Sequence, residues 1–426
     1  MMLPKAIEPK GMNSRTVFIA ALQLQAHERD AFDIVWPRIL QHVVDAGRTG
    51  AQLIVLPEGT VPAYVIGKEP IDPSVSERAL NDVQEAARAT GAVIVYGSVR
   101  TERNLTYNSA YVVDADGTLA GTADKCFLWH FDRQWFAPGS LRGPIQTSLG
   151  KLGVLICADG RVPTIARRLV DDGAEILVMP TAWVTSGRDP QNLENAQADL
   201  LARVRAQENL RPFVAANKVG VERRCVAYCG KSQILDSGGN TVARASQDRP
   251  EILTGSVALS RTIPARARAR HDLRRAGSSR SSRIALTPFD DSAGVVRDLL
   301  RADYTLGPGN EPSPDAQIAI VDDATMMDPA GAIVWRAAGY RLLLWKTELP
   351  DMQLVRSFAR ARALELRLFV AVVAEDRYAF AVDPDGTIVC GTFGEFRTTL
   401  FHFEPARTAQ TSVAPDTDIE EALGRF

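Results

Sequence analysis

The chain has 426 residues, of which 46% are hydrophobic and 23% are charged, which is enough apolar material for a large buried core. Its formal net charge of −2 excludes a chain-wide attraction to nucleic acid or to anionic membranes. No apolar run approaches the roughly 20 residues needed to span a bilayer. We therefore expect a globular protein with neither a nucleic-acid nor a membrane partner.

The first residues of the chain and its cysteines indicate the cellular compartment in which the protein is expected. Residues 1–14 carry charges but no long apolar segment, which predicts a flexible lead rather than a signal peptide. The five cysteines are too few and too scattered for a disulfide scaffold, and their odd number leaves at least one free thiol. Free thiols are typical of a reducing compartment, so we expect a cytoplasmic protein.

Apolar strands and amphipathic helices alternate over the first 260 residues. Strands are predicted at 17–25, 51–59, 92–99, 151–157, 174–180 and 212–220, with hairpins at 107–121 and 231–245. Helices are predicted at 31–49, 73–90, 164–173 and 197–210. This alternation predicts an α/β layered fold with mixed sheets. The segment 15–260 is therefore interpreted as one domain.

An arginine-rich segment follows at 261–283, with eight arginines and no compact apolar run. It could be an arm that binds nucleic acid or a solvated connecting segment. We favour the connecting segment because the rest of the chain offers no supporting basic patch.

The remaining residues, 284–426, resemble the second half of the first domain. Three stretches of the earlier domain find counterparts in the same order, beginning with 153–156 opposite 318–321. In this alignment Asp322 stands opposite Cys157, and Glu365 stands opposite Glu208. We interpret this region as a degenerate, thiol-free half-repeat. The alternative is an unrelated α/β segment with a similar strand–helix–strand pattern.

Three polar residues stand where buried strands end or loops begin: Glu58, Lys125 and Cys157. A thiol becomes nucleophilic when a neighbouring base takes its proton, and a carboxylate can be that base. A fixed ammonium and a backbone N–H can stabilise the negative charge that develops on the attacked group. No histidine is evidently paired with Cys157, which disfavours a Cys–His mechanism.

Seven segments resemble, in chain order, the motifs of the nitrilase superfamily of carbon–nitrogen hydrolases. They are LIVLPEG, YNSAYVVDADG, DKCFLWHFDRQWFAPG, LGVLICADGRVP, MPTAW, RVRAQENLRPFVAANKVG and GKSQILDSGGNTVA. The resemblance covers about residues 15–275 and implies a four-layer αββα sandwich. It implies that Glu58 is the general base, that Lys125 stabilises the tetrahedral intermediate and that Cys157 is the nucleophile. No metal or organic cofactor is implied.

The chain departs from the family pattern in the loop after the lysine, where Asp132 replaces a common second glutamate. Asp132 is a candidate second acid, or else an ordinary exposed loop residue. After the nucleophile, Cys157–Ala158–Asp159 resembles amidases and N-carbamoyl amidohydrolases rather than nitrilases. We therefore expect a small amide or N-carbamoyl substrate. Arg161 would bind a substrate carboxylate, or would form a salt bridge within its loop.

Other site residues follow from the same resemblance. Tyr64, Trp129, Ala158 and Trp183 are candidate pocket residues alongside Arg161. Glu208 is expected to support the active-site loops without reacting.

Two further alternatives for the activity share the same residues: nitrile hydrolysis, and acyl transfer to an acceptor other than water. A binding or scaffold protein built on an inactive hydrolase is the alternative of another class. Relatives often assemble by dimerisation, so a homo-oligomer is expected. The half-repeat could replace part of a dimer contact, or could cover the pocket.

Overall fold

The computed structural model describes residues 15–185, 189, 191–262, 264, 280–291, 294–310, 317–392 and 397–425. The predicted lead at 1–14 and most of the arginine-rich segment lie outside these residues. The chain forms two compact units. The first contains the chain up to Cys126, Gln134–Gly160 and Arg168–Pro264, and the second contains Phe127–Arg133, Arg161–Arg167 and the chain from Ala265 onward.

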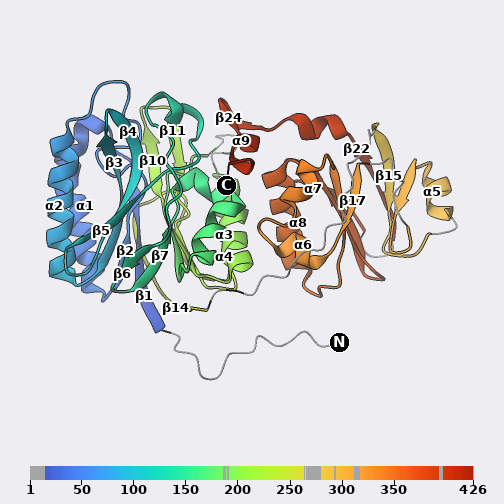
Figure 1. Ribbon diagram of the computed structural model, residues 1–426, viewed down its shortest axis with the longest axis horizontal. Helices are drawn as coiled ribbons and strands as arrows, with labels where there is room; N and C mark the ends of the chain where they lie inside the picture. The colour runs from blue at the N-terminus through green and yellow to red at the C-terminus, as the bar shows by residue number, and fades with distance from the viewer. Residues whose placement is uncertain are drawn as a thin grey trace. The chain divides into compact units, whose positions relative to one another are not determined.

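The first unit contains an eight-stranded sheet with two helices on one face (Figure 1). Its order is β11-β10-β1-β2-β3-β4-β5, and β14 also pairs with β1. The strands are β1 (Arg15–Gln25), β2 (Leu53–Val55), β3 (Val93–Glu102), β4 (Leu105–Val113), β5 (Leu119–Asp124), β10 (Lys218–Glu222), β11 (Val226–Cys229) and β14 (Glu251–Leu259). Helices α1 (Phe32–Arg48) and α2 (Pro73–Thr90) bury apolar side chains such as Trp36 and Val83 against β1, β2 and β3.

A six-stranded sheet forms the other inner layer of this unit, in the order β13-β12-β9-β8-β7-β6. Its strands are β6 (Ile145–Thr147), β7 (Gly150–Val154), β8 (Ile176–Pro180), β9 (Phe213–Ala216), β12 (Gln233–Leu235) and β13 (Thr241–Arg244). Helices α3 (Pro163–Asp171) and α4 (Ala202–Asn209) lie beside it, the latter in contact with β9. Figure 1 shows the resulting sequence of layers, helix–sheet–sheet–helix, from α2 to α4. The predicted mixed α/β fold is confirmed.

The strand predicted over 212–220 is two strands in two different sheets. Strand β9 belongs to the six-stranded sheet and β10 to the eight-stranded sheet, with Asn217 between them. The Asn217 backbone N–H donates to Ser232 Oγ at 2.9 Å, and its side-chain amide donates to the Gly230 carbonyl at 2.7 Å. Its Oδ1 accepts from the Trp183 N–H at 2.8 Å. These bonds hold the chain where it crosses from one sheet to the other, which hydrophobic periodicity does not reveal.

Two more elements differ from the sequence prediction. The helix predicted at 197–210 begins with a π-helical turn, Gln197–Leu201, before α4. Strand β14 was not predicted, although it pairs antiparallel with β1 along most of that strand. Its alternating exposed and buried residues give only a weak apolar signal.

The second unit is organised around a five-stranded sheet in the order β17-β18-β19-β20-β21. These strands are β17 (Ile318–Val321), β18 (Leu342–Lys346), β19 (Phe369–Ala374), β20 (Tyr378–Val382) and β21 (Ile388–Gly391). Smaller sheets join β15 (Ser282–Leu286), β16 (Tyr304–Leu306) and β22 (Thr399–Phe403), and β23 (Ser412–Ala414) with β24 (Thr417–Asp418). The helices are α5 (Val295–Leu300), α6 (Asp323–Met327), α7 (Ile333–Ala337), α8 (Met352–Leu366) and α9 (Ile419–Leu423).

The core of the second unit joins the faces of its two larger sheets, with Leu286, Leu344 and Phe401 among its buried residues. Within the described parts of both units, no helix combines the length and the apolar character that crossing a bilayer requires.

Candidate active site

The three residues proposed to react come from the ends of strands in both sheets of the first unit. Glu58 follows β2 and Lys125 follows β5, both in the eight-stranded sheet, whereas Cys157 follows β7 in the six-stranded sheet. All three are buried, with exposed fractions of 0% for Glu58, 1% for Lys125 and 5% for Cys157. The reacting groups therefore meet between the two sheets.

Glu58 and Lys125 form a buried ion pair. Lys125 Nζ donates to Glu58 Oε1 at 2.7 Å, and the Asn108 amide donates to the same oxygen at 2.7 Å. Because the pair is buried, water screens its charges only weakly. The electrostatic interactions of Glu58 and Lys125 with each other and with nearby groups are therefore stronger than at the protein surface. Asn108 lies on β4 and was not identified from the sequence. Its only signal there was a polar residue within an otherwise apolar strand.

The backbone around Glu58 depends on a close approach by Gly97 of β3. A Cβ atom at Gly97 would lie 2.6 Å from Glu58 Cα, so no other residue fits without a shift. The Glu58 N–H donates to the Thr181 carbonyl at 3.3 Å, across to the end of β8. The general-base candidate is thus fixed by both sheets.

Asp159 connects the end of the lysine strand with the end of the cysteine strand. One of its carboxylate oxygens accepts from the Cys126 N–H and the other from the Ile156 N–H, each at 3.0 Å. Asp159 is only 2% exposed. The Cys-x-Asp pattern seen in the sequence therefore has a direct structural consequence, because it places Lys125 and Cys157 at a fixed separation.

Cys157 occupies a backbone conformation that side chains rarely adopt. Its φ is +44°, and it opens the 3-10 turn Cys157–Arg161. A non-glycine residue in this left-handed region costs about 1–3 kcal/mol and persists only where the surroundings enforce it. Such outliers concentrate at functional sites, which agrees with a nucleophile presented on a tight turn.

The electrostatic surroundings keep the Cys157 thiol protonated. Burial raises the pKa of the Cys157 thiol to about 12, and the charge of Glu58 adds to the rise. Lys125, the Thr181 hydroxyl and the Ala182 backbone N–H oppose it. A thiol with so high a pKa is protonated at neutral pH, so it can act as a nucleophile only if a neighbouring base takes its proton. Thr181 and Ala182 were not identified from the sequence, although both belong to the MPTAW motif.

Three of the predicted pocket residues are almost completely buried. Tyr64, Ala158 and Trp183 are each 1% exposed. The Tyr64 ring centroid lies 5.8 Å from Lys125 Nζ, which places this ring beside the catalytic ion pair. Contact of these residues with a substrate remains a prediction.

Three further predicted site residues, Trp129, Asp132 and Arg161, lie on the short segments assigned to the second unit. The Arg161 guanidinium stacks over the Trp129 ring at 4.4 Å. Asp132 is fully buried and accepts from the Trp129 N–H at 3.0 Å, so the alternative of an exposed loop aspartate is wrong. The roles of Asp132 as a second acid and of Arg161 as a carboxylate ligand remain predictions.

Glu208 forms a buried ion pair with Arg205, three residues earlier on α4. Arg205 Nε in turn donates to the Gly160 carbonyl at 2.9 Å, within the turn that begins at Cys157. This contact is the physical basis for the supporting role expected of Glu208.

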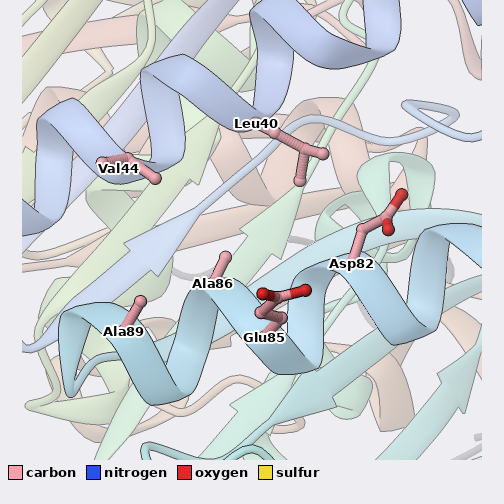
Figure 2. Close-up of a pocket in the computed structure, with 6 residues that line it drawn as sticks. All are labelled: Leu40, Val44, Asp82, Glu85, Ala86 and Ala89. Carbon is pink, nitrogen blue, oxygen red and sulfur yellow. The ribbon is translucent and has the colours of Figure 1, made fainter.

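A surface hollow of about 260 Å³ lies elsewhere, between α1 and α2. Figure 2 shows its six lining residues, Leu40, Val44, Asp82, Glu85, Ala86 and Ala89, none of which belongs to the catalytic set. The described residues also contain no group of three or more His, Cys, Asp or Glu side chains placed to hold a metal ion.

Comparison with known proteins identifies the family. The sequence profile described as Carbon-nitrogen hydrolase matches residues 18–267. A probable nitrilase of Schizosaccharomyces pombe is 33% identical over 176 residues, covering 41% of this chain and 62% of the relative's own length. An N-carbamoylputrescine amidase of Solanum tuberosum is 28% identical over 269 residues, covering 58% of this chain and 88% of the relative.

Solved structures agree with this assignment. A carbon-nitrogen hydrolase from Helicobacter pylori G27 matches with a TM-score of 0.51 and 25% identity, covering 57% of this chain and 89% of that one. Since the family profile covers more than half of the chain, the predicted resemblance to the nitrilase superfamily is confirmed. The chain belongs to the carbon–nitrogen hydrolase family, whose members are enzymes that act on carbon–nitrogen bonds other than peptide bonds.

Proposed function

We propose that this enzyme hydrolyses the carbon–nitrogen bond of a small amide or N-carbamoyl compound through an acyl-enzyme on Cys157. The observation that carries the proposal is the buried Glu58–Lys125 ion pair beside a thiol that its surroundings keep protonated. Cysteine acyl transfer needs a base that takes the thiol proton and a group that stabilises the oxyanion, and a carboxylate and an ammonium can fill these two roles.

The first half of the reaction forms the acyl-enzyme. Cys157 Sγ attacks the carbonyl carbon while its proton passes to Glu58, and the carbonyl oxygen gains the negative charge. Lys125 Nζ stabilises that charge. When the intermediate collapses, the carbon–nitrogen bond breaks, and the leaving nitrogen takes the proton from Glu58. Ammonia or an amine departs, and a thioester remains on the cysteine.

The second half returns the enzyme to its starting state. Glu58, again a carboxylate, takes a proton from water as that water attacks the thioester carbon. The carbon–sulfur bond then breaks, Cys157 recovers its proton from Glu58, and the acid product leaves. Water and substrate are the only reactants consumed, and Glu58 takes up and gives back one proton in each half of the reaction.

The choice of an amide or N-carbamoyl group is supported by the Cys157–Ala158–Asp159 sequence and by the similarity to an N-carbamoylputrescine amidase. Nitrile hydrolysis on the same residues is the second candidate, which the similarity to a probable nitrilase favours. The two candidates differ in the atom that receives negative charge, which is oxygen in an amide and nitrogen in a nitrile.

An ammonia-release screen tests the proposal. Short amides, N-carbamoyl amino acids and N-carbamoyl amines are compared with the matching nitriles, and intact-mass measurement identifies the acyl group held on the protein. Amide or N-carbamoyl turnover with an adduct on Cys157 is expected. Cys157→Ala should lose both turnover and adduct, whereas Cys225→Ala, at an exposed cysteine, should keep both.

Three outcomes would contradict the proposal in different ways. Turnover of nitriles alone would favour the second candidate. Product formation only with an added amine or hydroxylamine would indicate acyl transfer. Absence of any adduct or turnover with all three substrate classes would favour a non-catalytic protein.

A further inference from the structure

We propose that Lys218 is a positioning residue for the general base: clamped by Glu222 and Tyr228, it fixes the loop that carries Glu58 and holds a second positive charge beside that carboxylate. This inference rests on the proposed function, in which Glu58 moves the protons. It concerns residues of the first unit that the sequence analysis left without a role.

Lys218 begins β10 and is 1% exposed. Its ammonium donates to the Gly59 carbonyl at 2.8 Å, on the residue directly after Glu58. Gly59 itself has a φ of +55°, and a Cβ atom there would lie 2.5 Å from Tyr64 Cα, so the loop is tightly folded at this point. A hydrogen bond from a buried charged donor to this carbonyl therefore fixes the backbone next to the catalytic carboxylate.

Glu222, at the other end of β10, holds the far end of the same loop. Its Oε1 accepts from the Val65 N–H at 2.6 Å, and its Oε2 accepts from the Tyr228 hydroxyl at 2.7 Å. That second oxygen also lies 3.6 Å from Lys218 Nζ. Strand β10 thus fastens the loop from Gly59 to Val65 at both ends with one lysine and one glutamate.

Two tyrosine rings enclose the ammonium of Lys218. Its Nζ lies 6.0 Å from the Tyr64 ring centroid and 5.6 Å from the Tyr228 ring centroid, within the range of cation–π attraction. The two rings meet edge to face at 6.1 Å. Lys125 Nζ also lies 5.8 Å from the Tyr64 ring centroid, so both ammonium groups contact the same ring.

The charges around Glu58 come from several elements. Lys125 follows β5, Lys218 and Glu222 lie on β10, Tyr228 lies on β11, and Cys157 follows β7. Burial lowers the pKa of Lys218, whereas the negative charges of Glu222 and Glu58 act to raise it.

His27 contributes no charge to this group. Burial, followed by the charge of Lys218, lowers the pKa of His27 to about 4, so its ring is neutral at physiological pH. With His27 neutral, the positive charges that oppose protonation of Glu58 are those of Lys125 and Lys218.

Stability alone does not account for a charge at position 218. Removing two opposite charges from water costs several kcal/mol per ion, and apolar residues of similar volume often pack as well or better. A buried lysine at this position is explained if its positive charge has a functional role. The positive charge of Lys218 favours the ionised form of Glu58, and in the proposed mechanism Glu58 has to be ionised before each turnover.

The test is the variant Lys218→Met, whose unbranched side chain is one atom shorter than that of lysine and carries no charge. We expect kcat to fall about 100-fold, the loss typical of a misplaced catalytic group, with little change in KM. The acid limb of the kcat/KM profile should move to higher pH, because Glu58 binds a proton more readily once a positive neighbour is gone. Lys231→Met is the matched control: Lys231 is 9% exposed and bonds Asp199 at 3.0 Å, so its removal should leave kcat and the acid limb unchanged.

Two further variants keep the test decisive if Lys218→Met fails to fold. The double variant Lys218→Met/Glu222→Gln removes both buried charges and should show the same fall in kcat, with a smaller shift of the acid limb because the lost negative charge offsets part of the lost positive charge. Tyr228→Phe removes only the hydroxyl that Glu222 accepts from and should lower kcat about tenfold. Its control is Tyr96→Phe, at another fully buried tyrosine, which should not change kcat.

The inference is overturned if folded Lys218→Met, or the double variant, keeps the wild-type kcat and acid limb. It is also overturned if activity falls with an unmoved acid limb and to the same extent as in Lys231→Met, since that is a general loss of structure. These results require an active wild-type enzyme. An inactive wild type would contradict the proposed function instead, so the two failures are distinguishable.

Discussion

The six-stranded sheet of the catalytic unit and the five-stranded sheet of the C-terminal unit share one strand order. In the first, β7, β8, β9, β12 and β13 are neighbours in that order, and in the second, β17 to β21 are. The first two pairings are parallel and the last two antiparallel in each sheet. The final pairing also carries a register shift in both, after Ile234 in one and after Ala381 in the other.

The helices before the third strand carry the same buried ion pair. Arg205 pairs with Glu208 on α4, and Arg362 pairs with Glu365 on α8 at 2.8 Å. Each arginine also donates its Nε to a carbonyl in the helical turn that follows the first strand, at Gly160 in one unit and at Met326 of α6 in the other. These matches support our proposal that the C-terminal unit is a copy of the second half of the first domain, with Asp322 at the position of Cys157.

The two regions differ where the first strand ends. Cys157 has a φ of +44° and opens a 3-10 turn, whereas Asp322 has a φ of −105° and caps α6 by accepting from the Thr325 N–H at 2.8 Å. The same framework therefore exists with and without the strained backbone. The difference teaches that the left-handed backbone belongs to the position of Cys157 and is not required by the strand arrangement.

The largest effect on activity should come from replacing Cys157, in contrast to replacing Asp322 at the equivalent strand end. Cys157→Ala should reduce turnover on the order of 10⁴-fold or more, as removal of a nucleophile does in other acyl-transfer enzymes. Asp322→Ala should leave kcat and KM unchanged. Steady-state kinetics on both variants measures the contrast. A comparable loss of activity in both would mean that the C-terminal unit takes part in the chemistry.

The next effect concerns the two buried ion pairs. Glu208→Gln and Glu365→Gln each remove a buried negative charge that pairs with an arginine, and each should destabilise its own unit by about 3–5 kcal/mol. Hydrogen exchange read out by mass spectrometry locates the loosened unit. Only Glu208→Gln should also lower kcat, because Arg205 holds the Gly160 carbonyl in the nucleophile turn. Equal kinetic effects would remove this distinction between the units.

A third contrast concerns thiol chemistry as a function of pH. Since the pKa of Cys157 is raised to about 12, its thiolate fraction should increase about tenfold per pH unit between pH 8 and 10. Alkylation of the substrate-free enzyme by iodoacetamide, followed at the Cys157 peptide, should increase accordingly. A labelling rate that levels off below pH 9 would show that the resting thiol is already ionised.

The smallest effect concerns the helix cap. Asp322→Ala should cost the C-terminal unit about 1 kcal/mol, because α6 loses the carboxylate that accepts from its Thr325 N–H. Asp322→Asn, which keeps an oxygen in place, should cost less. Chemical unfolding monitored by Trp345, which is fully buried in this unit, measures the difference. A larger loss would indicate that Asp322 has retained a role beyond capping.

Much of this arrangement was predictable from local patterns. Apolar runs and turn residues indicated most strands of the catalytic unit, and the three polar strand ends indicated Glu58, Lys125 and Cys157. The positions of Asn108 and Thr181 were not predictable, because each contributes through a contact between segments far apart in the sequence.

The Lys218–Glu222 clamp was also missed. The two residues are four apart on one strand and so share a face, which is a readable signal of a buried pair. It was obscured because 212–220 was taken as one continuous strand, and the crossing at Asn217 depends on hydrogen bonds to Ser232, Gly230 and Trp183. Alternation of apolar residues carries no information about such a change of sheet.

The origin of the reacting groups in two sheets has one more consequence. Glu58 and Lys125 belong to one inner layer and Cys157 to the other, so in the proposed mechanism the distance over which the proton moves depends on the spacing of the two sheets. Facing sheets normally pack about 10 Å apart, a spacing determined by the side chains between them. A change of one methylene in that interior, far from any reacting atom, would alter the proton-transfer distance. The side chains between the two sheets thus set the spacing of the proposed reacting groups. Substitutions among these side chains should therefore reduce turnover more readily than they prevent folding.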